Sequence, residues 1–164
     1  MVEEHGATVV VGVDGSPAAR LAVAWAVQFA GGAGATVHAV AVCGVVPASP
    51  FLTVPTPREE VDLVAEQHHD MIAEALRQAD PQSHGVAVRT SVIHGEPGRA
   101  LCALSAGASA LVVGSHGRGA VLTALLGSVS AYCVRHAKCP VFVIPPDAVE
   151  SVDEVTGRAA ADAG

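Results

Sequence analysis

Residues 111–119 read Leu-Val-Val-Gly-Ser-His-Gly-Arg-Gly, and residues 127–130 read Gly-Ser-Val-Ser. The first stretch begins as an apolar run of strand length and continues into a glycine-rich loop. The second stretch lies where a helical pattern begins. Glycine lets the backbone adopt positive φ and approach a ligand closely, and a helix N-terminus offers unpaired N–H groups and a positive dipole end. Together, the two stretches predict a site for a phosphate group.

Each residue of this predicted site also has a simpler interpretation. Glycines after a strand often form only a tight turn, although a strand before the loop, a helix after it and Ser128 at the helix cap favour a phosphate site. Asp14 follows the first apolar run, where it can either cap its own turn or accept hydrogen bonds from a ribose or an adenine amine. His116 can donate to a phosphate oxygen or lie solvated in the loop.

Apolar runs rich in β-branched residues alternate with helical patterns along the chain. Strands are expected at residues 8–13, 35–43, 86–93, 110–114 and 141–144. Helices are expected at residues 17–30, 58–79, 99–106 and 127–137. Gly31 and Gly32 are expected to end the first helix, and residues 44–57, with four prolines, to form a loop. The alternation predicts an α/β protein with a parallel sheet and right-handed crossovers.

The order of the strands follows from the loops that carry suitable chemistry. Open parallel sheets bind ligands at the carboxyl ends of strands, where the winding direction reverses. Here the two suitable loops follow the first and fourth strands. If both serve one ligand, these strands are neighbours and the order is 3-2-1-4-5. The fifth strand, Val141–Ile144, is then an apolar edge that invites pairing with a second copy of the chain.

Composition and charge exclude several classes of protein. The 164 residues are 51% hydrophobic but only 3% aromatic, so the core must consist of Val, Ala and Leu. The net charge of −7 comes mainly from residues 58–77 and 147–164, and Lys138 is the only lysine. Without a basic stripe, nucleic-acid binding is not expected. No signal peptide and no membrane-spanning run are expected either, so the prediction is a cytoplasmic protein.

The cysteines and histidines carry no metal-binding pattern. The four cysteines, Cys43, Cys102, Cys133 and Cys139, show neither a C-x-x-C pair nor metal-ligand spacing. Because Cys43 lies in a strand-like run and Cys102 and Cys133 in helical ones, buried free thiols are expected. The histidines have no metal spacing. One domain is expected over residues 1–146, followed by an acidic, disordered tail over 147–164.

The opening stretches fit the spacing Gly-x2-Gly-x9-Gly-Ser, with Gly114, Gly117, Gly127 and Ser128 in the fixed places. Residues 9–16, Val-Val-Val-Gly-Val-Asp-Gly-Ser, and 139–145, Cys-Pro-Val-Phe-Val-Ile-Pro, are two further matches. These three segments resemble the universal stress protein family of the ATP-binding type. The resemblance extends along nearly the whole length of the chain. The resemblance implies a Rossmann-like open five-stranded parallel sheet of order 3-2-1-4-5, with helices on both faces.

The resemblance also implies a ligand, an assembly and a set of contact residues. The ligand is ATP, with or without Mg²⁺, and the assembly is a homodimer built around Val141–Ile144 that signals to an unknown protein partner. Ala39 matches a position that packs beside the adenine. The residues assigned to the nucleotide are Gly12, Val13, Asp14, Ala39, Val113, Gly114, His116, Gly117, Gly127, Ser128, Val129 and Ser130.

The sequence leaves three candidate functions, each from a different class of protein. The leading one is an ATP-binding regulatory protein of the stress response. A phosphotransferase or ATPase is the second, but the chain lacks a Walker lysine and a pair of acids near the loop for magnesium, so efficient catalysis is not expected and slow hydrolysis stays open. The third is a nucleotide-free interaction module, which the complete glycine motif disfavours. No catalytic residue and no metal ligand are assigned.

Overall fold

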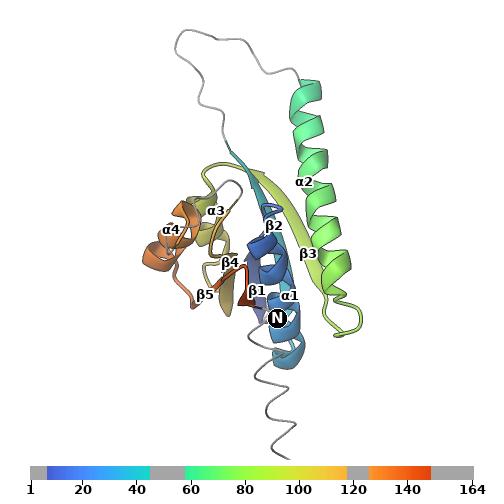
Figure 1. The fold of residues 1–164 in the computed structure, drawn as a ribbon, viewed down its shortest axis with the longest axis vertical. Helices are drawn as coiled ribbons and strands as arrows, with labels where there is room; N and C mark the ends of the chain where they lie inside the picture. Colours follow the sequence, from blue (N-terminus) through green and yellow to red (C-terminus); the bar gives the residue numbers. More distant parts are fainter. Residues whose placement is uncertain (1–6, 45–57, 118–125, 149–164) are drawn as a thin grey trace, which may run out of the picture.

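The computed structural model describes residues 7–44, 58–117 and 126–148. The strands within these ranges are β1 (Thr8–Gly12), β2 (Thr36–Cys43), β3 (Val88–His94), β4 (Ala110–Gly114) and β5 (Val141–Ile144). The helices are α1 (Pro17–Ala33), α2 (Arg58–Ala79), α3 (Pro97–Leu104) and α4 (Ser128–His136). Figure 1 shows their arrangement. The expected loop at 45–57 and the tail from 149 lie outside the described residues, so the domain boundary stays a prediction.

The five strands form one parallel sheet in the order β3-β2-β1-β4-β5. In its centre, Val11 of β1 pairs with Ala39 on one side and Val112 on the other. The predicted strand order is therefore confirmed, and β5 is an edge strand as expected. The carboxyl ends of β1 and β4, with the two loops that carry the predicted site, are neighbours.

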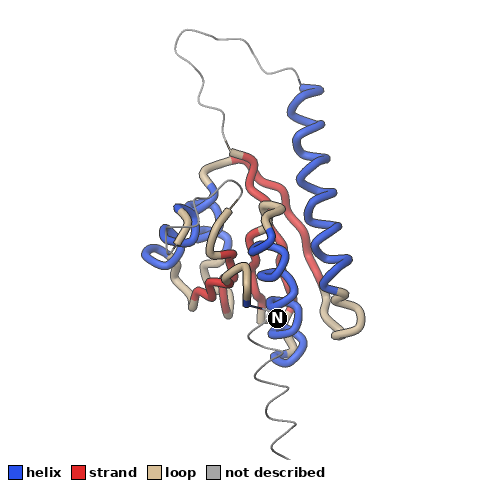
Figure 2. Tube along the Cα trace, in the orientation of Figure 1, coloured by secondary structure: helices blue, strands red, loops and turns tan. Residues whose placement is uncertain are grey.

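Alternate residues of the strands enter two separate cores. Val9 and Val11 pack with α1 and α2 on one face, whereas Val10 packs on the other face with Leu101 of α3 and Cys133 of α4. Each core consists of apolar side chains that pack against one another, which is typical of a parallel sheet buried between helices. Figure 2 shows α3 and α4 on one side of the strands and α1 and α2 on the other. Helices on both faces are thus confirmed.

Helix α1 begins as the sequence predicts but ends later. The Ser16 hydroxyl accepts a hydrogen bond from the Ala19 N–H at 3.1 Å, and Pro17 occupies the first turn. The expected end at Gly31 and Gly32 is wrong, because the helix continues to Ala33 and stops at Gly34, which has φ 64°. Gly31 lies inside the helix where a Cβ would be only 3.2 Å from the carbonyl oxygen of His84, so the loop after α2 packs closely there.

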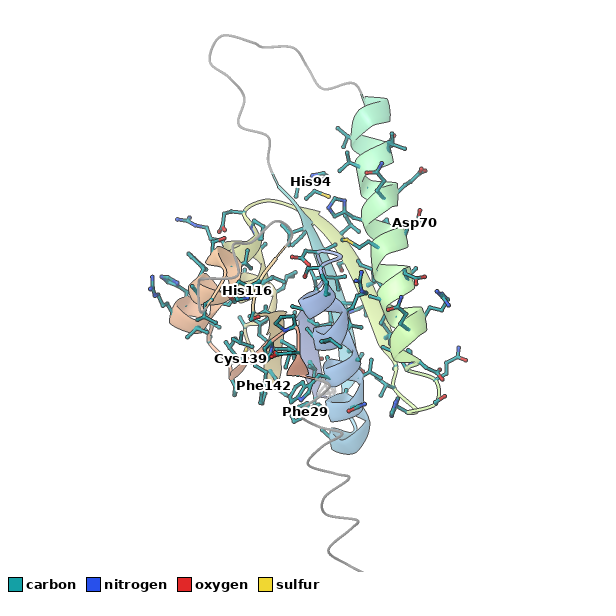
Figure 3. The ribbon with its side chains drawn as sticks, in the orientation of Figure 1. Phe29, Asp70, His94, His116, Cys139 and Phe142 are labelled. Atoms are coloured by element: carbon teal, nitrogen blue, oxygen red, sulfur yellow. The ribbon has the colours of Figure 1, made fainter. Side chains whose placement is uncertain are left out.

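Small side chains, and not the aromatic ones, form the buried face of α1. The buried residues are all Ala or Val (Ala18, Ala19, Ala22, Val23, Ala26, Val27 and Ala30). Trp25 and Phe29 lie at the margin of this buried face and contact Phe142 of β5, with 4.4 Å between the ring centroids of Trp25 and Phe142. Small residues let the helix approach the sheet closely, and the large rings collect at the edge (Figure 3).

The apolar stripe of α2 is buried only in its second half. Ile72 and Ala75 are buried in the core, but Val61 and Val64 are exposed. Figure 1 shows why, since the first turns of α2 extend past the ends of the strands. The sequence pattern gives the face of this helix correctly but cannot show where the sheet beneath it stops.

Two other boundaries differ from the expected ones because of local hydrogen bonds. Helix α3 starts at Pro97, two residues early, since the Glu96 carboxylate accepts hydrogen bonds from the N–H groups of Gly98 (3.1 Å) and Arg99 (2.9 Å). Strand β3 starts at Val88, two residues late. The Val86 N–H donates to the Pro81 carbonyl within the preceding turn and so is not available to the sheet.

Candidate functional site

A cavity of about 490 Å³ lies at the carboxyl ends of β1 and β4, between the sheet and helices α3 and α4. Its volume is in the usual range for a small-molecule site. Eleven of the twelve expected contact residues line it: Gly12, Val13, Asp14, Val113, Gly114, His116, Gly117, Gly127, Ser128, Val129 and Ser130. The sheet topology thus brings together residues that are up to 118 positions apart (130 minus 12).

Ala39 is the exception, and its expected place is corrected. It is fully buried in the core beneath α1 and α2, on the opposite face of the sheet. Val40 and Val42 of the same strand line the cavity instead. Because side chains alternate between the two faces of a strand, an offset of one residue changes the face.

Helix α3 contributes a wall that the sequence reasoning missed. Pro97 and Leu101 line the cavity, and Leu101 packs so closely on β1 that a Cβ on Gly12 would lie 2.9 Å from its Cδ1 atom. Gly12 therefore leaves room for the leucine. The apolar spacing of α3 was visible in the sequence, but nothing in it indicated which strand the helix covers.

Asp14 holds the turn between β1 and α1. Its Oδ1 atom accepts a hydrogen bond from the Ser16 N–H at 2.9 Å, so the capping role considered for this residue is present. Its other oxygen, Oδ2, faces the glycine loop and lies 2.8 Å from the position that a Cβ on Gly117 would take. One carboxylate thus connects the β1 turn with the glycine loop.

Ser115, which the sequence reasoning did not single out, holds both ends of the glycine loop. Its N–H donates to the Ile144 carbonyl at 2.8 Å, which ties the loop to the end of β5. Its carbonyl accepts hydrogen bonds from the Gly127 N–H at 2.6 Å and from the Ser130 hydroxyl at 2.9 Å. Both serines are buried. Buried, fully bonded polar groups of this kind fix the end of β5, Ser115 and the start of α4 relative to one another.

Helix α4 points its N-terminus at the cavity. Gly127, and not Ser128 as expected, is the N-cap residue, with φ −70° and ψ 167°. No side chain of the described residues caps this end. The first N–H groups of the helix and the positive end of its dipole are therefore available to an anion.

The motif glycines serve close approach and not unusual backbone angles. The described glycines with positive φ are Gly15, Gly34, Gly85, Gly95 and Gly107, none of which belongs to the motif. A Cβ on Gly114 would instead lie 2.9 Å from backbone atoms of α1, and one on Gly127 would lie 3.2 Å from the Ser115 carbonyl oxygen. The motif is needed because backbone segments touch at these points.

His116 is oriented by its neighbours. Its Nδ1 atom and the Ser115 hydroxyl are 2.9 Å apart, and its carbonyl accepts a hydrogen bond from the Ser16 hydroxyl at 3.3 Å. The ring lies beside the cavity (Figure 3). Arg118, which could screen phosphate charge, is outside the described residues. Within the described part of the chain, no group of three or more His, Cys, Asp or Glu side chains could hold a metal ion.

A model of the universal stress protein family matches residues 7–145. The chain belongs to this family. A universal stress protein of Mycobacterium bovis is 37% identical over 158 residues, which is 85% of this chain and 48% of that protein. This family member therefore spans about half the length of that relative.

Solved structures of the family agree with the fold. The chain is similar to UspA from Lactobacillus plantarum, with a TM-score of 0.71, 26% identity, and coverage of 87% of this chain and 99% of that one. A universal stress protein solved in complex with cAMP has a TM-score of 0.58, 27% identity, and coverage of 87% and 99%. Within residues 7–44, 58–117 and 126–148, every helix is too short or too polar to cross a membrane.

Proposed function

We propose that this chain is a cytoplasmic regulatory protein that binds an adenine nucleotide, with ATP as its ligand, with or without Mg²⁺. The phosphates would lie at the N-terminus of α4, against Ser128, Val129 and Ser130. The base and sugar would lie between β1, β2 and α3. As a homodimer, the protein would signal the bound state to a protein partner.

The observation that carries this proposal is the uncapped N-terminus of α4, which opens onto a cavity with apolar walls. Anions bind helix N-termini through N–H groups and the helix dipole. The opposite part of the cavity offers apolar side chains for a flat base (Val40, Val42, Leu101 and Val113). One structural relative was solved in complex with cAMP, which supports a nucleotide as the class of ligand.

The chemistry of the lining supports binding without efficient turnover. The described lining residues include one carboxylate, Asp14, and no lysine or arginine. One oxygen of that carboxylate is already hydrogen-bonded within its own turn. Phosphoryl transfer relies on positioned cations and on a group that orients the nucleophile, and these residues supply neither.

The first experiment is to denature freshly purified protein and to identify the released nucleotide by chromatography. We expect ATP at a level near one per chain, since a built anion site with apolar walls retains its ligand. ADP in its place would favour the ATPase alternative. A protein that is empty and also fails to bind added ATP, ADP or cAMP would overturn the proposal and favour the interaction module.

The proposed homodimer rests on the edge strand β5 and on the aromatic cluster beside it. Val141, Phe142 and Val143 are only half-buried in the single chain. The carbonyl of Pro140 accepts a hydrogen bond from the N–H of Leu111 in β4, and the carbonyl of Ile144 accepts one from the N–H of Ser115 just after it. Because the direction of these groups alternates along a strand, the backbone groups of Val141 and Val143 point to the free edge.

Val143→Pro is expected to convert the dimer to a monomer without unfolding it. The substitution removes an N–H that points away from β4, so the sheet keeps its own bonds while a second chain loses a partner. Light scattering coupled to size exclusion measures the mass. Val143→Thr is the matched control, because it keeps the N–H and the β-branched shape and should remain dimeric. A dimer that survives Val143→Pro would contradict pairing through β5.

A further inference from the structure

Three of the four cysteines lie together on one face of the sheet. Cys133 of α4 is completely buried, and Cys102 of α3 and Cys139 pack half-buried against the same core. Cys139 lies just before β5 (Figure 3). Cys43 extends the row of Ala39 and Ala41 on β2, which faces the opposite core, so the sheet separates it from the other three.

The thiols meet because α3 and α4 approach closely. A Cβ on Gly98 would lie 2.7 Å from the ring of Tyr132, so the tyrosine packs directly on the backbone of α3. Cys102 is one turn further along α3, and Cys133 follows Tyr132 on α4. There the side chains of Cys102 and Cys133 are neighbours in one apolar cluster, and each affects the pKa of the other. Neighbouring thiols on two closely packed helices are an arrangement from which a disulfide can form.

We propose that Cys102 and Cys133 are a redox pair, and that a peroxide converts them to a disulfide that ties α3 to α4. In the first step Cys102 is oxidised to a sulfenic acid while the peroxide is reduced to water. The Cys133 sulfur then attacks the Cys102 sulfur, and the sulfenic oxygen leaves as a second water. Overall, two thiols lose two protons and two electrons, which reduce one peroxide to two waters. In a reducing compartment such a bond is reversible and regulatory.

The surroundings of the pair determine which thiol reacts first and how fast. Burial raises the pKa of Cys133 to about 12, with further contributions from Cys102, Glu96 and Cys139. Burial also raises the pKa of Cys102, but the neighbouring Cys133 side chain opposes that rise. Cys102, which is also less buried, is therefore the thiol that meets the oxidant. With little thiolate at neutral pH, oxidation is slow under mild conditions and accelerates with pH.

The pair is placed where it can act on the cavity. Leu101, the neighbour of Cys102, lines the cavity, as do the first residues of α4. A covalent bond between the helices would hinder their separation. Provided that the proposed nucleotide binding is correct, the disulfide is expected to slow nucleotide release several-fold.

The test is to treat the full chain with hydrogen peroxide at mildly alkaline pH and to map disulfides by mass spectrometry without reduction. We expect a Cys102–Cys133 link, a mass lower by two hydrogens, and a Tm higher by several degrees because the link restricts the unfolded chain. Dithiothreitol should reverse all three. Cys102→Ser should abolish the link, whereas Cys43→Ser and Cys139→Ser should keep it.

Other outcomes would overturn the redox pair. These are a peroxide-treated chain whose Cys102 is fully oxidised but not linked to Cys133, and a link from Cys102 to Cys139 in its place. Cys133→Ala is a second variant, with a small apolar side chain suited to the core, and it should also lose the link. The mapping needs no nucleotide, so a failure of the proposed nucleotide function would leave it interpretable. If the disulfide forms but nucleotide release is not slower, the redox pair stands and only its proposed effect on the cavity is wrong.

Discussion

Gly114→Ala is expected to destabilise the fold by about 1–3 kcal/mol, the usual cost of overpacking. The new methyl group would lie 2.9 Å from the carbonyl carbon of Ala18 and 2.9 Å from the Ala19 nitrogen. Both are backbone atoms of the first turn of α1, and Ser16 fixes that turn through its hydrogen bond to Ala19. Since no side chain can rotate away, either α1 or β4 must shift.

Urea unfolding followed by circular dichroism measures this loss, which should also lower Tm by about 2–4 °C per kcal/mol. Gly32→Ala is the matched control, because a Cβ on Gly32, near the end of α1, has nothing within 4 Å. Alanine favours a helix over glycine, so this variant should be as stable as the natural chain or more so, by up to about 1 kcal/mol. Equal unfolding midpoints for the two variants would contradict the close contact between β4 and α1.

Much of the fold could be predicted because strand patterns and loop chemistry agree. The apolar runs locate the five strands, and the placement of site-like loops after β1 and β4 makes those strands neighbours, which fixes the order that the structure confirms. The errors are at helix ends, where a tertiary contact or a local cap that the hydrophobic pattern does not show decides the boundary. Gly31 stays helical because the loop at His84 packs on it, and α3 begins early because Glu96 caps it.

In the site too, the sequence pattern identifies residues but does not show which residues they contact. The motif identifies the glycines, but its physical reason, close approach of separate backbone segments, appears only when β4, α1 and Asp14 are placed together. Ser115 occupies a variable position of the motif, between Gly114 and Gly117, yet it connects β5, the glycine loop and α4. Ala39 and Val40 differ by one position, and only the register of β2 decides which of them faces the cavity.

Gly117→Ala is expected to leave the fold intact and to weaken nucleotide binding by about 10- to 100-fold, or roughly 1.4–2.8 kcal/mol. The atom nearest to the new methyl group would be Asp14 Oδ2, at 2.8 Å. A carboxylate oxygen at the end of a side chain can move at little cost in stability. It cannot move without changing the contact between the β1 turn and the glycine loop, on which the shape of the cavity depends.

Isothermal titration calorimetry with ATP measures the affinity, and the urea midpoint verifies the fold. Gly32→Ala should bind as the natural chain does. The role of Asp14 is tested in an Asp14→Ala background, where the missing carboxylate leaves room for the methyl group and Gly117→Ala should cost little more. If the losses of ATP affinity in the two single variants add fully in the double variant, the methyl group obstructs the nucleotide itself. An unchanged affinity of the single variant would remove Gly117 from the site and, with it, the argument that this loop must approach a ligand closely.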